Sequence, residues 1–215
     1  IMNFLRMGTT GLTAQALGAQ DTAEVRAWLA RAAILSGAIS IGILALQTPI
    51  LWVSLHLVGA SPEVSALAAD YFLIRVWGAP AALLNLALIG WLVGQQKTTS
   101  VLLVQIVGNL LNAGLDILLV WWWDWGVSGV ALASVVAEYT MMIMAMLIAL
   151  KHIQWQPPAL EWFNKTARKF LMKLNGDMLL RNLALQACLA FLTIQGARYG
   201  QTATAVNAIL MQFFV

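Results

Sequence analysis

An amide and a carboxylic acid lie four residues apart inside a long apolar stretch of the sequence. Asn112 and Asp116 occur in the stretch 99–123, in which Asp116 is the one charged residue. Residues four apart share a face of an α-helix, and Asn109 lies one turn earlier near that face. A carboxyl group in a low-dielectric pocket resists ionisation because desolvation disfavours the anion, so Asp116 could change protonation near physiological pH. The pattern favours a cation-handling site over the alternative, a hydrogen bond that packs helices and a carboxyl group close to the outer aqueous edge.

A second acid, Glu138, lies in the middle of another apolar stretch, four residues after Ser134. For this pair we give equal weight to a packing role and to proton handling, because both uses place an acid inside a span. Arg75 is expected to form a stabilising ion pair with Asp70 near the outer end of its own stretch. The sequence therefore predicts Asp116 as the principal group, and Ser134 and Glu138 as secondary contributors.

The composition is that of a membrane protein. Hydrophobic residues make up 61% of the 215 residues and charged residues 10%, with a mean hydropathy of +0.80. Soluble domains carry roughly 25% charged residues. The sequence has no basic stripe with interleaved aromatic residues, which argues against nucleic acid as a partner. Cys188 is the only cysteine, which excludes an internal disulfide and a cysteine metal cluster. No HExxH, GxSxG or P-loop motif indicates an enzyme, a metal site or a cofactor.

Five apolar stretches are long enough to cross a membrane, since a spanning helix needs about 20 apolar residues. They cover 33–55, 71–94, 99–123, 127–150 and 178–199, with partial spans at 1–17 and 203–215. Backbone amides in lipid must bond within their own segment, so we expect an all-α integral membrane protein, a polytopic helical bundle. Ser61 is predicted to cap the next helix, and Pro49 and Pro80 to kink theirs. Small residues at 8, 11, 14 and 18 and in 126–133 predict close helix contacts. Both ends of the sequence fall inside apolar runs, so we expect a piece of a larger transporter.

Lysine and arginine are concentrated in alternate connections between the spans, and positively charged connections stay in the cytoplasm. We therefore predict that 18–32, 95–98 and 151–177 are cytoplasmic, and that an amphipathic helix at 161–174 lies on the membrane surface. The tryptophan cluster at 121–125 is then expected at the outer interface as part of an aromatic belt. A platform on which a substrate stacks is the alternative interpretation of this cluster.

Several stretches resemble the multidrug and toxic compound extrusion (MATE) transporters. The segment TTGLTAQALGAQ at 9–20 resembles the end of the second helix of that family. Residues 95–97, followed by Asn109, Asn112 and Asp116, resemble the fourth-to-fifth helix segment, and GVSGVALAS at 126–134 resembles the start of the sixth helix. The sequences of residues 4–19 and 206–211 most resemble the bacterial DinF (DNA-damage-inducible protein F) branch. The order and spacing of these motifs extend the resemblance over essentially the whole chain.

The resemblance implies a twelve-helix fold of two six-helix lobes around a central cleft, with this chain running from the second helix into the eighth. The N-lobe would cover 1–150, the basic linker 151–177, and the first helices of the C-lobe 178–215. Asn112 and Asp116 match the polar cation-site pair on the family's fifth helix. The aspartate on the family's first helix has no counterpart in this sequence. The resemblance further implies export of cationic or amphipathic compounds, driven by inward flow of protons or, alternatively, sodium ions.

We therefore expect a monomeric, multi-pass antiporter of a bacterial inner membrane that takes small-molecule substrates, needs the rest of its own chain and works by alternating access. A lipid-linked glycan flippase of the same superfamily is the alternative. Such a flippase should carry several cationic residues facing the cleft, whereas we expect arginine within spans only at their ends. A membrane-embedded enzyme lacks support because no nucleophile–base or metal constellation is found. A non-transport membrane subunit is the remaining alternative.

Overall fold

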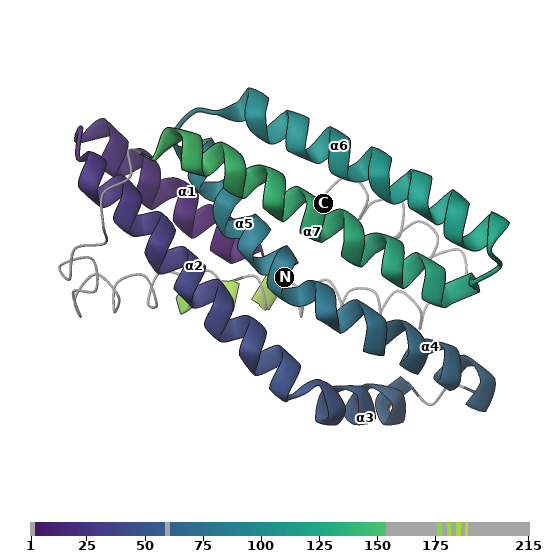
Figure 1. Ribbon diagram of the computed structural model, residues 1–215. Helices are drawn as coiled ribbons and strands as arrows, with labels where there is room; N and C mark the ends of the chain where they lie inside the picture. The colour runs from purple at the N-terminus through teal and green to yellow at the C-terminus, as the bar shows by residue number, and fades with distance from the viewer. Residues whose placement is uncertain are drawn as a thin grey trace, which may run out of the picture.

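The computed structural model describes residues 3–58 and 61–153, together with 176–177, 180–181, 184–185 and 188. The described part is helical (Figure 1). Its elements are α1 (Asn3–Gly18), α2 (Thr22–Ala45), α3 (Gln47–Val58), α4 (Pro62–Arg75), the 3-10 turn η1 (Val76–Gly78), α5 (Ala79–Gly94), α6 (Thr98–Asp116), the π-helical segment η2 (Ile117–Trp122) and α7 (Gly126–His152). The predicted linker helix and the spans at 178–199 and 203–215 lie outside these residues almost entirely, so the division of the chain into two lobes stays a prediction.

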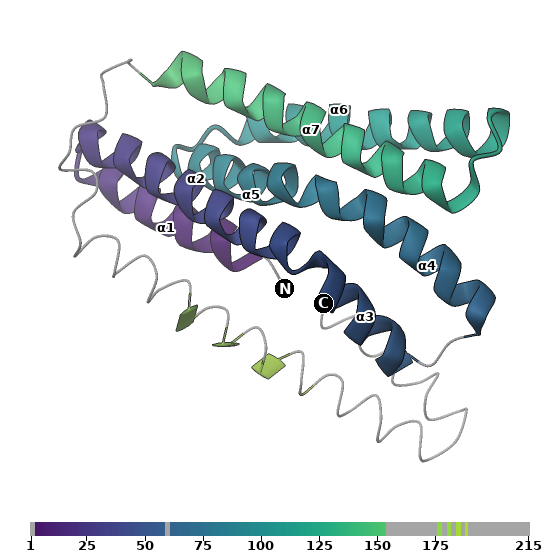
Figure 2. The same cartoon turned by 60° about the horizontal axis from the view of Figure 1, so that its bottom comes forward.

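Four helices in the described ranges are long and apolar enough to cross a membrane. They are Thr22–Ala45, Pro62–Gly94, Thr98–Trp122 and Gly126–His152. The predicted all-α, polytopic architecture is thereby confirmed. Helix α5 forms its centre, because it packs against α1 and α2 on one side and against α7 on the other, while α6 packs mainly on α7 (Figure 2).

The span predicted at 33–55 is divided into two helices. Helix α2 begins eleven residues earlier, at Thr22, where the Asp21 side chain accepts a hydrogen bond from the Glu24 amide at 2.9 Å. The sequence did not indicate this start because the first turns of α2 carry charged residues. Two of them are paired: Glu24 forms a 2.6 Å ion pair with Arg31, which is 8% exposed. Helix α2 ends at Ala45, before Pro49, and α3 continues from Gln47. The predicted interruption near Pro49 is therefore present as a break between two helices.

The span predicted at 71–94 begins earlier than expected, at Pro62. Ser61 caps it as predicted, because its hydroxyl group accepts a hydrogen bond from the Val64 amide at 3.4 Å. The 3-10 turn η1 precedes Pro80 and joins α4 to α5. Proline lacks the N–H that an α-helix would need at this point, which accounts for the tighter turn. This longer helix places Arg75 near the middle of the 33-residue span Pro62–Gly94 and not at its end.

Small residues bring the helices together, although not always those predicted. A Cβ atom at Gly90 would lie 2.6 Å from the Arg6 carbonyl oxygen, and one at Gly94 would lie 2.8 Å from that of Thr10. Helix α5 thus approaches α1 through a Gly-xxx-Gly pair. Within α1, nothing lies within 4 Å of Cβ positions at Gly11 and Gly18, and Ala14 is exposed, so Gly8 is the buried member of the predicted small-residue stripe. The predicted contact in α7 is present, since Gly129, Ala131 and Ala133 are buried.

Candidate functional site

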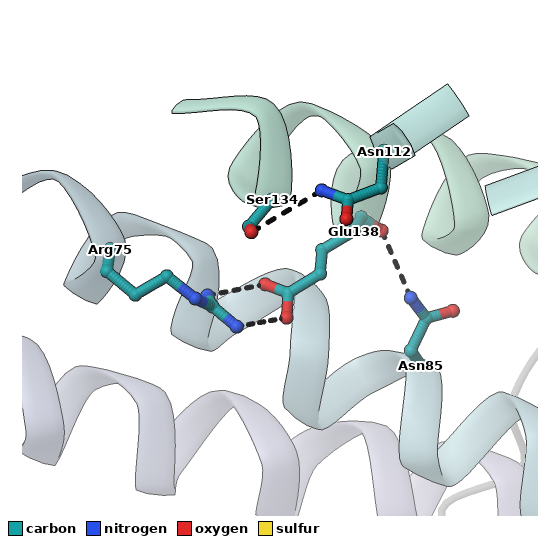
Figure 3. Close-up of polar contacts among 5 residues, drawn as sticks. All are labelled: Arg75, Asn85, Asn112, Ser134 and Glu138. Atoms are coloured by element: carbon teal, nitrogen blue, oxygen red, sulfur yellow. Dashed lines mark hydrogen bonds and ion pairs between the residues drawn. The ribbon is translucent and has the colours of Figure 1, made fainter. Parts of the chain in front are cut away.

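An ion pair joins helices α4 and α7 (Figure 3). Arg75 Nη1 donates to Glu138 Oε2 at 2.8 Å, and Nη2 donates to Oε1 at 2.5 Å. The two side chains are 33% and 16% exposed, respectively. Glu138 lies near the middle of the 27-residue helix α7, and Arg75 near the middle of its own span. Two-pronged pairing of this kind fixes orientation as well as charge.

The surroundings of this pair are adapted to it. Gly78, in the turn η1, has no room for a side chain, because a Cβ atom there would collide with both Arg75 and Glu138. Asn85 of α5 is 5% exposed and donates its Nδ2 to the Glu138 carbonyl oxygen at 3.0 Å. Helices α4, α5 and α7 are therefore joined by polar contacts around a single acidic residue.

A second polar group lies along α6, towards the tryptophan end of the bundle. Asn112 Nδ2 donates to Ser134 Oγ at 3.4 Å (Figure 3). If the Asn112 amide is turned over, Nδ2 donates to Asp116 Oδ2 at 3.3 Å and the amide oxygen accepts from the Ser134 amide at 3.1 Å. Asp116 Oδ1 is buried and has no hydrogen-bond partner among the described residues. The turned orientation satisfies both ends of the amide, so Asn112 presents its Nδ2 donor to the carboxyl group of Asp116.

Two cavities lie along the seam between these helices. The first, which we call the Asn112 cavity, has a volume of about 180 Å³ and is lined by Arg75, Asn109, Asn112, Ser134 and Glu138, with Gly108, Ala137 and Met141. The second, the Asn85 cavity, has a volume of about 220 Å³ and includes Asn85, Gln105, Glu138 and Met141 in its lining. Glu138 and Met141 belong to both linings, so the two cavities are neighbours.

The structure brings together four of the five predicted site residues. Asn109, Asn112, Ser134 and Glu138 line the Asn112 cavity. Asp116 does not line it, but lies one helical turn from Asn112 at the end of α6, directly before the π-helical segment. Within the described part of the chain, no group of three or more His, Cys, Asp or Glu residues could hold a metal ion.

Arg75 is the site residue that the sequence did not indicate. The predicted pair with Asp70 is wrong, because Arg75 binds Glu138 of another helix. The expectation that arginine occurs only at span ends fails for the same residue. The predicted N-cap at Ser61 could have indicated this. A helix that begins after Ser61 and continues to Gly94 places Arg75 near the middle of the span. Asn85 and Gln105 were also missed, since single amides in apolar runs carry little information.

Comparisons with known proteins give a consistent result. The family model MatE matches residues 1–118. DNA damage-inducible protein F of Escherichia coli K12 is 40% identical over 214 residues, which are 98% of this chain and 47% of that protein. Protein DETOXIFICATION 43 of Arabidopsis thaliana is 31% identical over 156 residues, which are 72% of this chain and 29% of that protein. The chain therefore spans about half the length, or less, of these curated relatives.

Solved structures share the fold. The MATE transporter VcmN of Vibrio cholerae, in a bent form, superposes with a TM-score of 0.81 at 22% identity, covering 99% of this chain and 49% of that one. A MOP superfamily transporter from Pyrococcus furiosus superposes with a TM-score of 0.83 at 22% identity, covering 99% of this chain and 48% of that one. At this identity the likeness establishes the arrangement of the helices.

Proposed function

Because this chain belongs to the MATE family, whose members are membrane transporters and not enzymes, we propose that the protein is a secondary active antiporter. It exports amphipathic or cationic small molecules in exchange for an inward-moving cation, by alternating access between two lobes. The cation is a proton, with sodium as the alternative. The protein acts as a monomer in a bacterial inner membrane, with 18–32, 95–98 and 151–177 on the cytoplasmic side.

The observation that carries this proposal is the environment of Asp116. One carboxylate oxygen is buried without a hydrogen-bond donor, and the other lies 3.3 Å from the Asn112 side-chain amide. A buried carboxylate oxygen without a donor is costly, so an acid at such a position inside a span is a candidate for handling a cation. This is the role that the proposal gives to Asp116.

Asn112 is placed to hold Asp116. In the orientation that satisfies both ends of the amide, Asn112 Nδ2 donates to Asp116 Oδ2 at 3.3 Å and the amide oxygen accepts from the Ser134 amide at 3.1 Å. Protonation of Asp116 from outside would remove the charge to which Asn112 donates, which would change the polar contact between α6 and α7 and so bias the packing of the lobe.

Glu138 is less suited to carry the proton. Its carboxylate is held by both terminal nitrogens of Arg75, and arginine stays protonated in proteins. A cation that binds Glu138 would have to displace Arg75 and leave its charge without a partner in a partly buried place. The same pairing counts against a lipid-linked glycan flippase, because the cationic charge of Arg75 is already neutralised.

Replacement of Asp116 by Asn in the full-length protein tests the proposal. Drug efflux driven by a pH gradient in everted vesicles should be abolished, because an amide cannot release a proton, while the amount of protein in the membrane stays unchanged. Asp124→Asn is the matched control, since Asp124 is exposed in the connection before α7 and its φ of +53° is one that asparagine also adopts. Normal efflux by the Asp116 variant would remove this residue from the mechanism. Efflux driven by a sodium gradient at constant pH would assign the coupling ion to sodium instead.

A further inference from the structure

The Asn112 cavity and the Asn85 cavity share two lining residues of α7, which we call the partition. Glu138 and Met141 contribute to the lining of both cavities, and they lie three residues apart on one face of the helix. Together the two cavities follow the seam of α5, α6 and α7 over several helical turns. Their polar linings include Asn112 and Ser134 on one side of the partition, and Asn85 and Gln105 on the other.

Met141 forms the apolar half of the partition. Its side chain lies so close to Gly108 of α6 that a Cβ atom at Gly108 would overlap Met141 Cγ and Sδ. The absence of a side chain at Gly108 therefore lets the thioether fill the space between α6 and α7. A flexible, unbranched side chain is well suited to close such a gap.

Arg75 and Glu138 form the charged half of the partition. Glu138 lines both cavities, whereas Arg75 lines the Asn112 cavity alone. Because the two charges cancel, a cation that moves along the seam meets no net charge at the partition. Fixed charges of this kind decide which ions pass a constriction inside a membrane protein.

We propose that the two cavities are the halves of a water-filled proton passage along the α5–α6–α7 seam, closed at rest by Met141 and by the Arg75–Glu138 ion pair. Each cavity has room for several water molecules and offers polar partners to them. The passage would connect the neighbourhood of Asp116 with the opposite half of the membrane. This inference rests on the proposed function, because a coupled proton must leave Asp116 on the side opposite to its entry.

The proposal makes the two members of the ion pair act with opposite sign. Arg75→Gln leaves Glu138 as an unpaired anion, which attracts protons and water into the passage. Glu138→Gln leaves Arg75 as an unpaired cation, which repels protons. A purely structural ion pair predicts a different result, because either variant breaks the same two hydrogen bonds.

Passive proton leak through the full-length protein measures this difference. The protein is reconstituted in liposomes that contain a pH-sensitive dye, a potassium diffusion potential is applied with valinomycin, and no transport substrate is added. We expect Arg75→Gln to raise the leak rate roughly tenfold above wild type, because a unit charge a few ångströms away shifts a proton's energy well beyond thermal energy. Glu138→Gln should stay at or below the wild-type rate.

Met141→Ala provides a second measurement that leaves the ion pair intact, and it should also raise the leak severalfold. Met146→Ala is its control, because Met146 lies on the same helix, is also partly buried, and lines neither cavity. Equal proton leak rates for Arg75→Gln and Glu138→Gln would overturn the proposed passage. A wild-type leak rate for Met141→Ala would overturn it as well. The assay needs no substrate, so it stays informative even if Asp116→Asn retains efflux and the proposed function fails.

Discussion

Gly78 faces the carboxylate of Glu138 at close range. A Cβ atom at Gly78 would lie 2.5 Å from Glu138 Oε2 and 2.5 Å from Arg75 Nη1. The backbone of Gly78 has φ −75° and ψ −17°, which any residue can adopt. The glycine is therefore needed for space and not for its conformational freedom. The ion pair between Arg75 and Glu138 therefore packs directly against the backbone of the turn η1.

Gly78→Ala should displace this ion pair and destabilise the protein by about 2 kcal/mol, although alanine is otherwise the better helix former. The measurement is the thermal unfolding midpoint of the purified full-length protein in detergent. Gly37→Ala in α2 is the control, since nothing lies within 4 Å of its Cβ position and no loss is expected. An unchanged midpoint for Gly78→Ala would show that the pair is not tightly held.

Asn112→Ala should reduce pH-driven efflux about tenfold, because a hydrogen bond to a charged group contributes about 1.5–3 kcal/mol. The loss should appear in the maximal rate with little change in unfolding midpoint. Thr99→Ala is the control, because Thr99 lies at the other end of α6, is exposed and lines neither cavity. Similar efflux rates for the two variants would exclude Asn112 as the partner of Asp116.

Gly94→Ala should separate α1 from α5, because a Cβ atom would lie 2.7 Å from Thr13 Cβ and 2.8 Å from the Thr10 carbonyl oxygen. Backbone atoms cannot move aside cheaply, so we expect a loss of about 1–3 kcal/mol. Gly11→Ala, on α1 but away from the contact, should be neutral. Thermal unfolding followed by circular dichroism compares the two. Equal midpoints would mean that the helices can part without cost.

Cysteine labelling in intact cells tests the predicted orientation. In a full-length protein freed of its other cysteines, Trp122→Cys should react with a membrane-impermeant maleimide from outside, since Trp122 is 81% exposed. Lys97→Cys, at the opposite end of α6, should react only after the membrane is permeabilised. Both helix ends carry exposed residues, so reactivity reports sidedness rather than burial. The reverse pattern would invert the predicted topology.

The all-α architecture was predictable because a bilayer imposes it: long apolar runs must form helices. The boundaries failed where charged residues are paired. A search for apolar runs leaves out first turns that carry charge. It therefore missed the start of α2, which contains the Glu24–Arg31 pair, and the exposed start of α4, which contains Glu63. Local capping signals were more reliable, as the hydrogen bond at Ser61 shows.

The polar pattern of the site was only partly visible in the sequence. The spacing of Asn112 and Asp116 was sufficient to place them on one face of α6, because helical periodicity is local. The pairing of Arg75 with Glu138 joins positions 63 residues apart, and no local rule chooses this partner over the nearer Asp70. Long-range pairing depends on how α4 and α7 cross, which is a property of the packed bundle.

The span Pro62–Gly94, in which the 3-10 turn η1 joins α4 to α5, has 33 residues, and at about 1.5 Å per residue it measures about 50 Å, against about 30 Å of hydrocarbon. Even with a strong tilt, several turns must stand in the headgroup layer or beyond it. The acidic positions Glu63 and Asp70 and the absence of any buried residue in α4 suit that place. In the predicted orientation this end faces outward, so an antibody fragment that binds residues 62–70 would act on the same helix that carries Arg75 at its other end.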